Sequence, residues 1–196
     1  MATKVSKTNQ QGKLIIFTAP SGAGKTTIVR HLIEQFEELA FSVSATNRER
    51  RPKEEHGRDY YFISTETFEE KVKNGDFMEW EEVYDGQYYG TLKSEIERIW
   101  ALGKTIIFDI EVKGATHIKQ AYPDNSLAVF IKPPSPEILF ERLRGRRTEN
   151  AKSLQKRIAR AAEELKYENK FDIVLVNDIL EVSLTEAERI VRKFIG

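Results

Sequence analysis

A glycine-rich turn lies between a short apolar run and an amphipathic helical pattern near the start of the chain. The apolar run covers residues 14–18 (LIIFT), which is typical of a buried parallel strand. The turn matches the pattern G-x-x-x-x-G-K-[ST], with alanine in place of the first glycine. Its residues are Ala19, Pro20, Ser21, Gly22, Ala23, Gly24, Lys25 and Thr26. This order of strand, turn and helix predicts a phosphate-binding loop.

The chemistry of such a loop explains its residue types. Glycines let backbone N–H groups curl around phosphate oxygens, and the following helix directs its positive end toward the same anion. We expect Lys25 to reach the β- and γ-phosphates of a nucleotide and Thr26 to offer its hydroxyl to Mg²⁺. The alternative is a glycine turn that only joins a strand to a helix, but a chance match is on the order of one percent in a chain of this length. Ala19 requires backbone angles that a Cβ tolerates.

Strands and helices alternate over much of the chain. Further apolar runs lie at 105–108, 127–131 and 173–176, and helical patterns lie at 93–101, 135–145, 151–169 and 183–195. This alternation predicts an α/β fold with a parallel sheet covered on both faces. Residues 44–92 break the rhythm, because they are rich in aromatic side chains and glycines. We expect short strands and turns there around one helix at 65–74, forming a small binding subdomain.

Composition limits the class of protein. No stretch approaches the roughly 20 apolar residues of a transmembrane helix, and residues 1–12 lack the apolar core of a signal peptide, so we expect a short disordered tail. The absence of cysteine excludes disulfides, thiolate metal sites and a cysteine nucleophile. The 31 basic and 31 acidic residues cancel, which argues against binding of long nucleic acid. We expect a cytoplasmic protein that does not enter a membrane.

The segment after the first helix discriminates among phosphate-loop proteins. Its key residues are Ser42, Val43, Ser44, Thr46, Arg48, Arg51, Glu54, Gly57 and Tyr60. At this segment the chain resembles the guanylate kinase family, whose pattern is close to S-V-S-x-T-T-R-x-x-R-x-x-E-x-x-G-x-x-Y-x-F. Further matches, from about Leu14 to the C-terminus, are Glu79-Trp80, Tyr88 to Thr91, Asp109 to Glu111, Gly114, Pro133 to Ser135, Arg142-Leu143, Gly145-Arg146 and Val176 to Asp178.

The resemblance implies a P-loop NTPase-type parallel sheet flanked by helices, with a small α+β GMP-binding insertion and a mobile helical lid. The implied core comprises 13–43, 93–134 and 159–196, the GMP-binding subdomain 44–92, and the lid 135–158. The implied reaction is Mg²⁺-dependent transfer of the γ-phosphate of ATP to GMP and dGMP, in purine nucleotide metabolism. The implied ATP-binding residues are the loop from Ala19 to Thr26, Thr27, and Asn177, which matches the position that touches adenine.

Recognition of the acceptor nucleotide follows from its chemistry. Guanine offers two donors, N1–H and the 2-amino group, for which a buried carboxylate is the natural partner. The resemblance assigns this role to Glu79, with Ser44 and Thr91 at the base edge. A solvated acidic stretch (Glu79, Glu81, Glu82) is the alternative interpretation of Glu79. The residues implied to hold the phosphate and the nucleoside are Arg48, Arg51, Tyr60, Tyr89 and Glu111, the last at a position that usually carries aspartate.

Catalysis of phosphoryl transfer depends on positioning and positive charge. The acceptor phosphate ionises near pH 6 and needs no general base, so we interpret His31, His56 and His117 as structural or surface residues. Residues 142–160 carry eight basic side chains and one acidic one. We expect a lid there rather than a basic face that pairs with acids elsewhere. The implied catalytic residues are Lys25, Arg48, Arg142, Arg146 and Arg157, and the implied Mg²⁺ contacts are Thr26 and Asp109, the latter through water.

Two rival functions remain at this point. One is a non-catalytic guanylate-kinase-like binding module, although such modules usually lose the phosphate loop that is intact here. The other is a kinase of another phosphorylated small molecule, which would not need Glu79 and Thr91 together. The chain departs from the family at Asn47, Arg50, Lys113 and Glu111, and it has one additional residue between Trp80 and Tyr88. The sequence leaves open whether the protein is a monomer or a homodimer.

Overall fold

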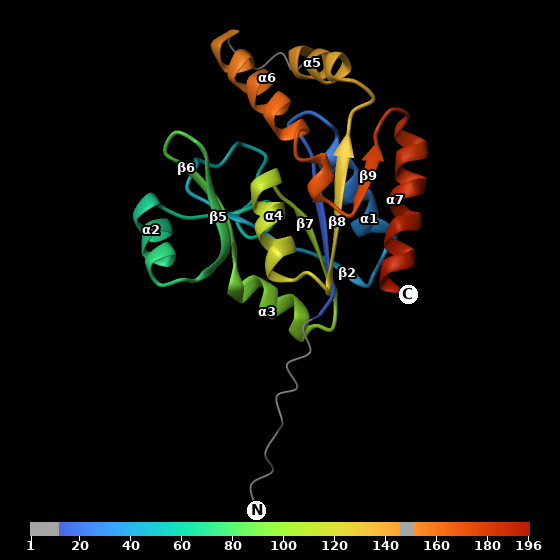
Figure 1. Cartoon of the computed structure of the whole chain (residues 1–196). Helices are drawn as coiled ribbons and strands as arrows, with labels where there is room; N and C mark the ends of the chain where they lie inside the picture. Colours follow the sequence, from blue (N-terminus) through green and yellow to red (C-terminus); the bar gives the residue numbers. More distant parts are fainter. Residues whose placement is uncertain (1–11, 146–150) are drawn as a thin grey trace, which may run out of the picture.

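The central feature of the computed structural model is a five-stranded parallel sheet (Figure 1). The structure describes residues 12–145 and 151–196. In spatial order the strands are β2 (Leu39–Phe41), β7 (Thr105–Asp109), β1 (Leu14–Thr18), β8 (Ser126–Lys132) and β9 (Ile173–Val176). The predicted α/β class with a parallel sheet flanked by helices is therefore confirmed.

Strand β1 lies in the middle of this sheet and is buried on both faces. Its alternating side chains divide between two cores. Ile15 and Phe17 pack in the core that includes α1 (Lys25–Gln35) and α7 (Leu180–Ile195). Leu14 and Ile16 pack in the core of the other face, with α3 (Lys93–Ala101) and α4 (Val112–Ala121). The continuous apolar run in the sequence reflects this two-sided burial.

A second sheet of four strands lies beside the first, entirely within residues 45–92 (Figure 1). Its order is β4 (Tyr61–Phe62), β3 (Ala45–Thr46), β6 (Gln87–Leu92) and β5 (Phe77–Tyr84), with α2 (Thr65–Lys73) packed on it. The ring of Phe68 on α2 stacks on Phe77 at 4.4 Å and on Tyr88 at 5.5 Å between centroids. Phe68, Phe77 and Tyr88 thus contribute to a small core that belongs to this sheet alone.

Asn47 joins three parts of this second sheet. Its amide nitrogen donates to Thr65 Oγ1 (2.9 Å) and to the carbonyl of Gly86 (2.8 Å), and its Oδ1 accepts from the N–H of Tyr88 (2.7 Å). A threonine at this position lacks the amide for these bonds. The departure from the family pattern at Asn47 therefore fastens the β5–β6 turn to β3 and α2.

Several elements differ from the sequence-based expectation. Helix α4 and strand β2 were not predicted, because β2 has only three residues and α4 mixes its apolar side chains with polar residues and a glycine. The helix expected at 151–169 is α6 (Ala151–Leu165), which ends earlier and is followed by a separate 3₁₀ turn (Glu168–Lys170). Helix α7 begins at Leu180, before the predicted 183. Helix α5 (Pro136–Gly145) agrees closely with its predicted range. Of the expected tail, residues 1–12, all but Gly12 lie outside the described residues, as do residues 146–150 of the expected lid. In the described part of the chain, no helix combines the length and the apolar character needed to cross a membrane.

Candidate active site

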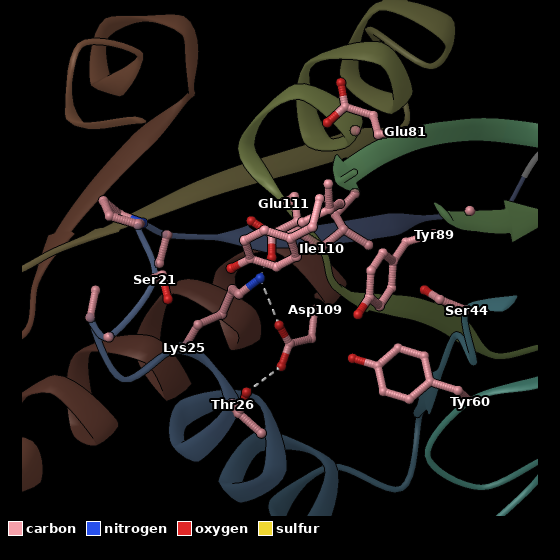
Figure 2. A pocket seen from close by; sticks show the side chains of 18 of the residues that line it. Ser21, Lys25, Thr26, Ser44, Tyr60, Glu81, Tyr89, Asp109, Ile110 and Glu111 are labelled. Atoms are coloured by element: carbon pink, nitrogen blue, oxygen red, sulfur yellow. Dashed lines mark hydrogen bonds and ion pairs between the residues drawn. The ribbon is translucent and has the colours of Figure 1, made fainter. Parts of the chain in front are cut away.

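A cavity of about 290 Å³ lies between the glycine-rich turn and the second sheet (Figure 2). One side is formed by residues 19–27. The predicted residues that line the rest of it are Ser44, Arg48, Arg51, Tyr60, Glu79, Tyr89, Asp109 and Glu111. Lining residues that were not predicted are Glu81, Val83, Tyr84, Gly90, Ile110 and Gly114. Residues far apart in the sequence thus converge on one cavity.

The backbone of the turn has the conformation that its glycines permit. Gly22 and Gly24 both have φ of +93°, a region that other residues rarely adopt. Ala19 does not have positive φ, since among the described residues only glycines do, so its Cβ causes no strain. Helix α1 follows at Lys25, and no side chain caps its start. Its first N–H groups are therefore available to an anion.

Lys25, Thr26 and Asp109 form a connected group at the floor of the cavity (Figure 2). Lys25 Nζ lies 2.8 Å from Asp109 Oδ1 and donates to the carbonyl of Ile110 at 2.7 Å. Thr26 Oγ1 donates to Asp109 Oδ2 at 2.8 Å. Burial alone would lower the pKa of Lys25, but the nearby carboxylates of Asp109 and Glu111 outweigh it and raise the pKa above its usual value. Lys25 is therefore a permanent cation at this floor.

The oxygens of Thr26 and Asp109 are the hard ligands that Mg²⁺ prefers, and Mg²⁺ usually keeps several waters alongside one or two such groups. Across the described ranges 12–145 and 151–196, no cluster of three or more His, Asp or Glu side chains is arranged to enclose a metal. Thr26 and Asp109 thus suit a Mg²⁺ ion that is held mainly by waters and by the phosphates of a ligand. They do not form a site that encloses a metal with protein groups alone.

Arg48 is held rigidly at the side of the cavity. Its guanidinium makes two bonds to the carboxylate of Glu54, both 2.7 Å, and its Nε donates to Tyr89 Oη at 3.1 Å. The ring of Tyr60 lies under it at 5.0 Å. The bond to Glu54 raises the pKa of Arg48, and the same bond lowers the pKa of Glu54 to about 2. Together with the exposed side chain of Arg51, this arrangement suits a phosphate dianion.

Glu79 lies in a dry position on β5. Its side chain is nearly buried, and its Oε1 accepts a 2.7 Å bond from the hydroxyl of Thr91, its partner across strands β5 and β6. Burial raises the pKa of Glu79 to about 7. Thr91 is fully buried and contributes through Glu79 instead of lining the cavity. These contacts exclude a solvated acid, the alternative interpretation of Glu79.

The wall beside Glu79 carries further charges. Glu81 follows on the same face of β5, and Lys113 Nζ lies 3.8 Å from its carboxylate. Glu111, immediately before α4, accepts from Arg160 Nη2 at 3.2 Å. The longer side chain at position 111 thus has a partner on α6. The signal for Arg160 was present only as one of many basic residues in the segment 142–160.

The predicted lid arginines that the structure describes approach the cavity from above the turn. Arg157 Nη2 donates to Ser21 Oγ at 2.8 Å, and Arg142 Nη2 donates to the carbonyl of Asn177 at 3.2 Å. Neither Arg142 nor Arg157 is among the residues that line the cavity, and Arg146 lies outside the described residues. Their convergence on a transferring phosphoryl group remains a prediction.

Asn177 has a different immediate contact from the one predicted. Its side chain is buried and donates to the carbonyl of Ala23 at 2.8 Å, and a Cβ on Gly24 would collide with its amide nitrogen. Asn177 therefore braces the phosphate-binding turn, and its contact with adenine stays a prediction. The three histidines do not line this cavity; one of them, His31, lies 2.8 Å from Glu188 on α7.

Comparison with known proteins bears directly on this site. The family model described as guanylate kinase matches residues 11–194. The chain belongs to the guanylate kinase family. It is 43% identical over 186 residues to a guanylate kinase of Bacteroides fragilis, covering 95% of this chain and 91% of the relative. It is 45% identical to the Porphyromonas gingivalis guanylate kinase, covering 94% of this chain and 98% of the relative.

A solved structure agrees. The fold matches the crystal structure of guanylate kinase from Anaplasma phagocytophilum with a TM-score of 0.74 and 28% identity, over 93% of this chain and 85% of that one. The family resemblance seen in the sequence is therefore confirmed, and the guanylate kinase match extends over the cavity and both of its walls.

Proposed function

We propose that this guanylate kinase family member transfers the γ-phosphate of ATP to GMP, giving ADP and GDP. The observation that carries the proposal is the buried carboxylate of Glu79, held by Thr91, which lines the same cavity as the phosphate-binding turn. A dry carboxylate accepts the two donors of guanine, whereas adenine would leave it unpaired at a cost of several kcal/mol.

The acceptor phosphate would bind at Arg48, Arg51, Tyr60 and Tyr89. Arg48 is already oriented by its two bonds to Glu54, so little side-chain entropy is lost on binding. Ser44 and Glu111 line the cavity between these groups and Glu79, where the nucleoside would lie. None of these contacts requires a 2′-hydroxyl by its chemistry, so we expect both GMP and dGMP to be substrates.

The donor phosphates would bind the N–H groups of residues 19–27 and Lys25. Mg²⁺, when bound near Thr26 and Asp109, would neutralise charge on the phosphates of ATP. Lys25 and Arg48 would stabilise charge on the transferring group from two sides, and Arg142, Arg146 and Arg157 would add positive charge from the lid. Because the acceptor is an ionised phosphate, no side chain has to remove a proton.

This activity would place the protein in purine nucleotide metabolism, with ATP and GMP or dGMP as its small-molecule partners. We expect it to act in the cytoplasm, as a monomer or a homodimer. The test is a coupled assay of ADP release with the five substrates GMP, dGMP, AMP, CMP and UMP. We expect kcat/KM for GMP to exceed that for AMP by at least about a hundredfold. Binding of GMP without ADP release would instead support the non-catalytic module. A ribose phosphate, assayed in parallel, tests the other rival, which preference for that substrate would support.

A further inference from the structure

Helix α6 lies between the phosphate-binding turn and the tip of the β5–β6 hairpin. Two of its residues, Arg160 and Glu164, are one turn apart and bonded to each other, with Arg160 Nε 2.7 Å from Glu164 Oε1. The second carboxylate oxygen of Glu164 accepts from the backbone N–H of Ser21 at 3.3 Å. Glu164 therefore contacts the ATP side of the cavity directly.

Arg160 contacts the other side of the cavity. Its Nη1 donates to the carbonyl of Val83 at 2.6 Å and its Nη2 to Glu111 Oε2 at 3.2 Å. Its guanidinium also lies 5.5 Å from the centre of the Tyr84 ring. All three partners line the cavity on the side of the second sheet and α4. Helix α6 therefore contacts both sides of the cavity: Glu164 contacts the phosphate-binding turn, and Arg160 contacts the wall where the acceptor nucleotide would bind.

We propose that Arg160 and Glu164 are positioning residues that couple the binding of the two substrates. The proposal rests on the proposed function, because it requires ATP and GMP in one cavity. A nucleotide that fixes the turn at Ser21 would favour one position of Glu164 and hence of Arg160. That position of Arg160 holds Val83, Tyr84 and Glu111 where the acceptor nucleoside would lie, so each substrate stabilises the arrangement that the other needs.

The proposed coupling depends on the positive charge of the Arg160 guanidinium. Glu164 is buried, burial raises its pKa, and the nearby carboxylate of Glu111 raises it further. Arg160 is the cation between these two carboxylates. Without it they would repel each other and separate α6 from α4. The planar fork of arginine reaches Val83, Glu111 and Glu164 at once, whereas a lysine ammonium can satisfy only part of this set.

The experiment measures the dissociation constant of GMP by calorimetry, with and without a saturating non-hydrolysable ATP analogue and Mg²⁺. For the unaltered protein we expect the analogue to tighten GMP binding by about fivefold or more. In Arg160→Gln we expect this ratio to fall below about two, while each substrate bound alone changes affinity less than about threefold. Arg160→Lys should give an intermediate ratio.

Two variants complete the design. Arg189→Gln removes an exposed arginine on α7 that pairs with Glu186, and it should keep the full ratio. Glu164→Gln tests the same linkage from the other residue, since its amide can still accept from Arg160 but only one of its two terminal atoms remains an acceptor. It serves as the deciding variant if Arg160→Gln does not fold.

Retention of the full ratio in a folded Arg160→Gln or Glu164→Gln variant would overturn the proposal, as would a ratio near one in the unaltered protein that still transfers phosphate. Equal weakening of both substrates with an unchanged ratio would also overturn it, because that result describes a merely structural role. Failure of the proposed function has a distinct sign: the unaltered protein would release no ADP with GMP.

Discussion

A Cβ on Gly114 would lie 2.6 Å from Oε2 of Glu79 and 3.2 Å from its Cδ. Helix α4 therefore passes so close to the carboxylate that only a hydrogen fits at this position. The carboxylate is confined between the backbone of α4 on one side and the hydroxyl of Thr91 on the other. Its direction is set by packing, which is what a group that recognises a flat base requires.

Gly114→Ala should displace Glu79 and weaken GMP recognition. We expect KM for GMP to rise about tenfold or more, because the added methyl group has to move the carboxylate out of line. Alanine favours a helix over glycine by about 1 kcal/mol, so loss of the helix is not the expected cause. Steady-state kinetics provide an internal control, since KM for ATP should stay within about twofold. An unchanged KM for GMP would contradict this role of Gly114.

Glu79→Gln should lower the preference for GMP over AMP by at least about tenfold, because the amide offers one acceptor where the carboxylate offers two. The same change should stabilise the free protein at pH 8. The pKa of Glu79 is about 7 in the folded protein against an ordinary 4.5, so its ionisation above pH 7 costs up to about 3 kcal/mol of folding free energy. Substrate competition and chemical denaturation at pH 8 measure the two effects.

The stability of the unaltered protein should depend on pH in the direction that this raised pKa dictates. Glu79 contributes stability below about pH 4.5, and this contribution is lost as the pH rises through about 7. GMP binding has the opposite dependence, since it needs the ionised carboxylate. Between pH 8 and pH 6 we expect the dissociation constant of GMP to rise about tenfold from Glu79 alone. The GMP phosphate also titrates near pH 6, and the profile of Glu79→Gln isolates that contribution.

Lys25→Ala should abolish phosphate transfer and leave the fold intact. We expect kcat to fall by about a thousandfold or more, because the permanent cation at the floor of the cavity is lost. Asp109 keeps its bond to Thr26 and faces the cavity, so the free energy of unfolding should fall by only about 1 to 3 kcal/mol. Single-turnover kinetics with circular dichroism test both statements, and a folded variant with ordinary kcat would refute the role of Lys25.

Glu54→Gln should raise KM for GMP about tenfold while changing KM for ATP less than twofold. The glutamine can no longer make two charge-assisted bonds to Arg48, so the guanidinium loses its fixed orientation. Glu55→Gln is a matched control, because the carboxylate of Glu55 is exposed and pairs with the exposed Arg58 on the surface. Equal effects of the two substitutions would show that Arg48 does not depend on Glu54.

The sequence predicts those parts of the fold and the site that have local signals. The turn at residues 19–26 and the strand before it are recognisable because their glycines and apolar run are contiguous. Helix α4 was not predicted, since its stability comes from the burial of Val112, Ala115 and Ile118 and not from a clear pattern of its own. The sequence also did not predict the close contact between this helix and Glu79.

Contacts between distant residues were the other part that sequence could not supply. Glu54 stood within the family pattern, yet its bond to Arg48 appears only when the loop is folded. Arg160 and Glu164 are spaced for one helix face, but their partners Ser21, Val83 and Glu111 lie about 50 to 140 positions away. Side chains that act through others in this way carry no local signature.

The central position of β1 has a consequence for co-translational folding of the protein. This strand is made early, but its neighbours β7 and β8 begin only at Thr105 and Ser126. Four strongly apolar residues and a threonine, with unpaired backbone groups, must therefore wait while about 90 more residues are translated, which takes several seconds at 5–20 residues per second. During that interval the apolar side chains and backbone groups of β1 lack their native partners, and the nucleotide loop that follows has no scaffold.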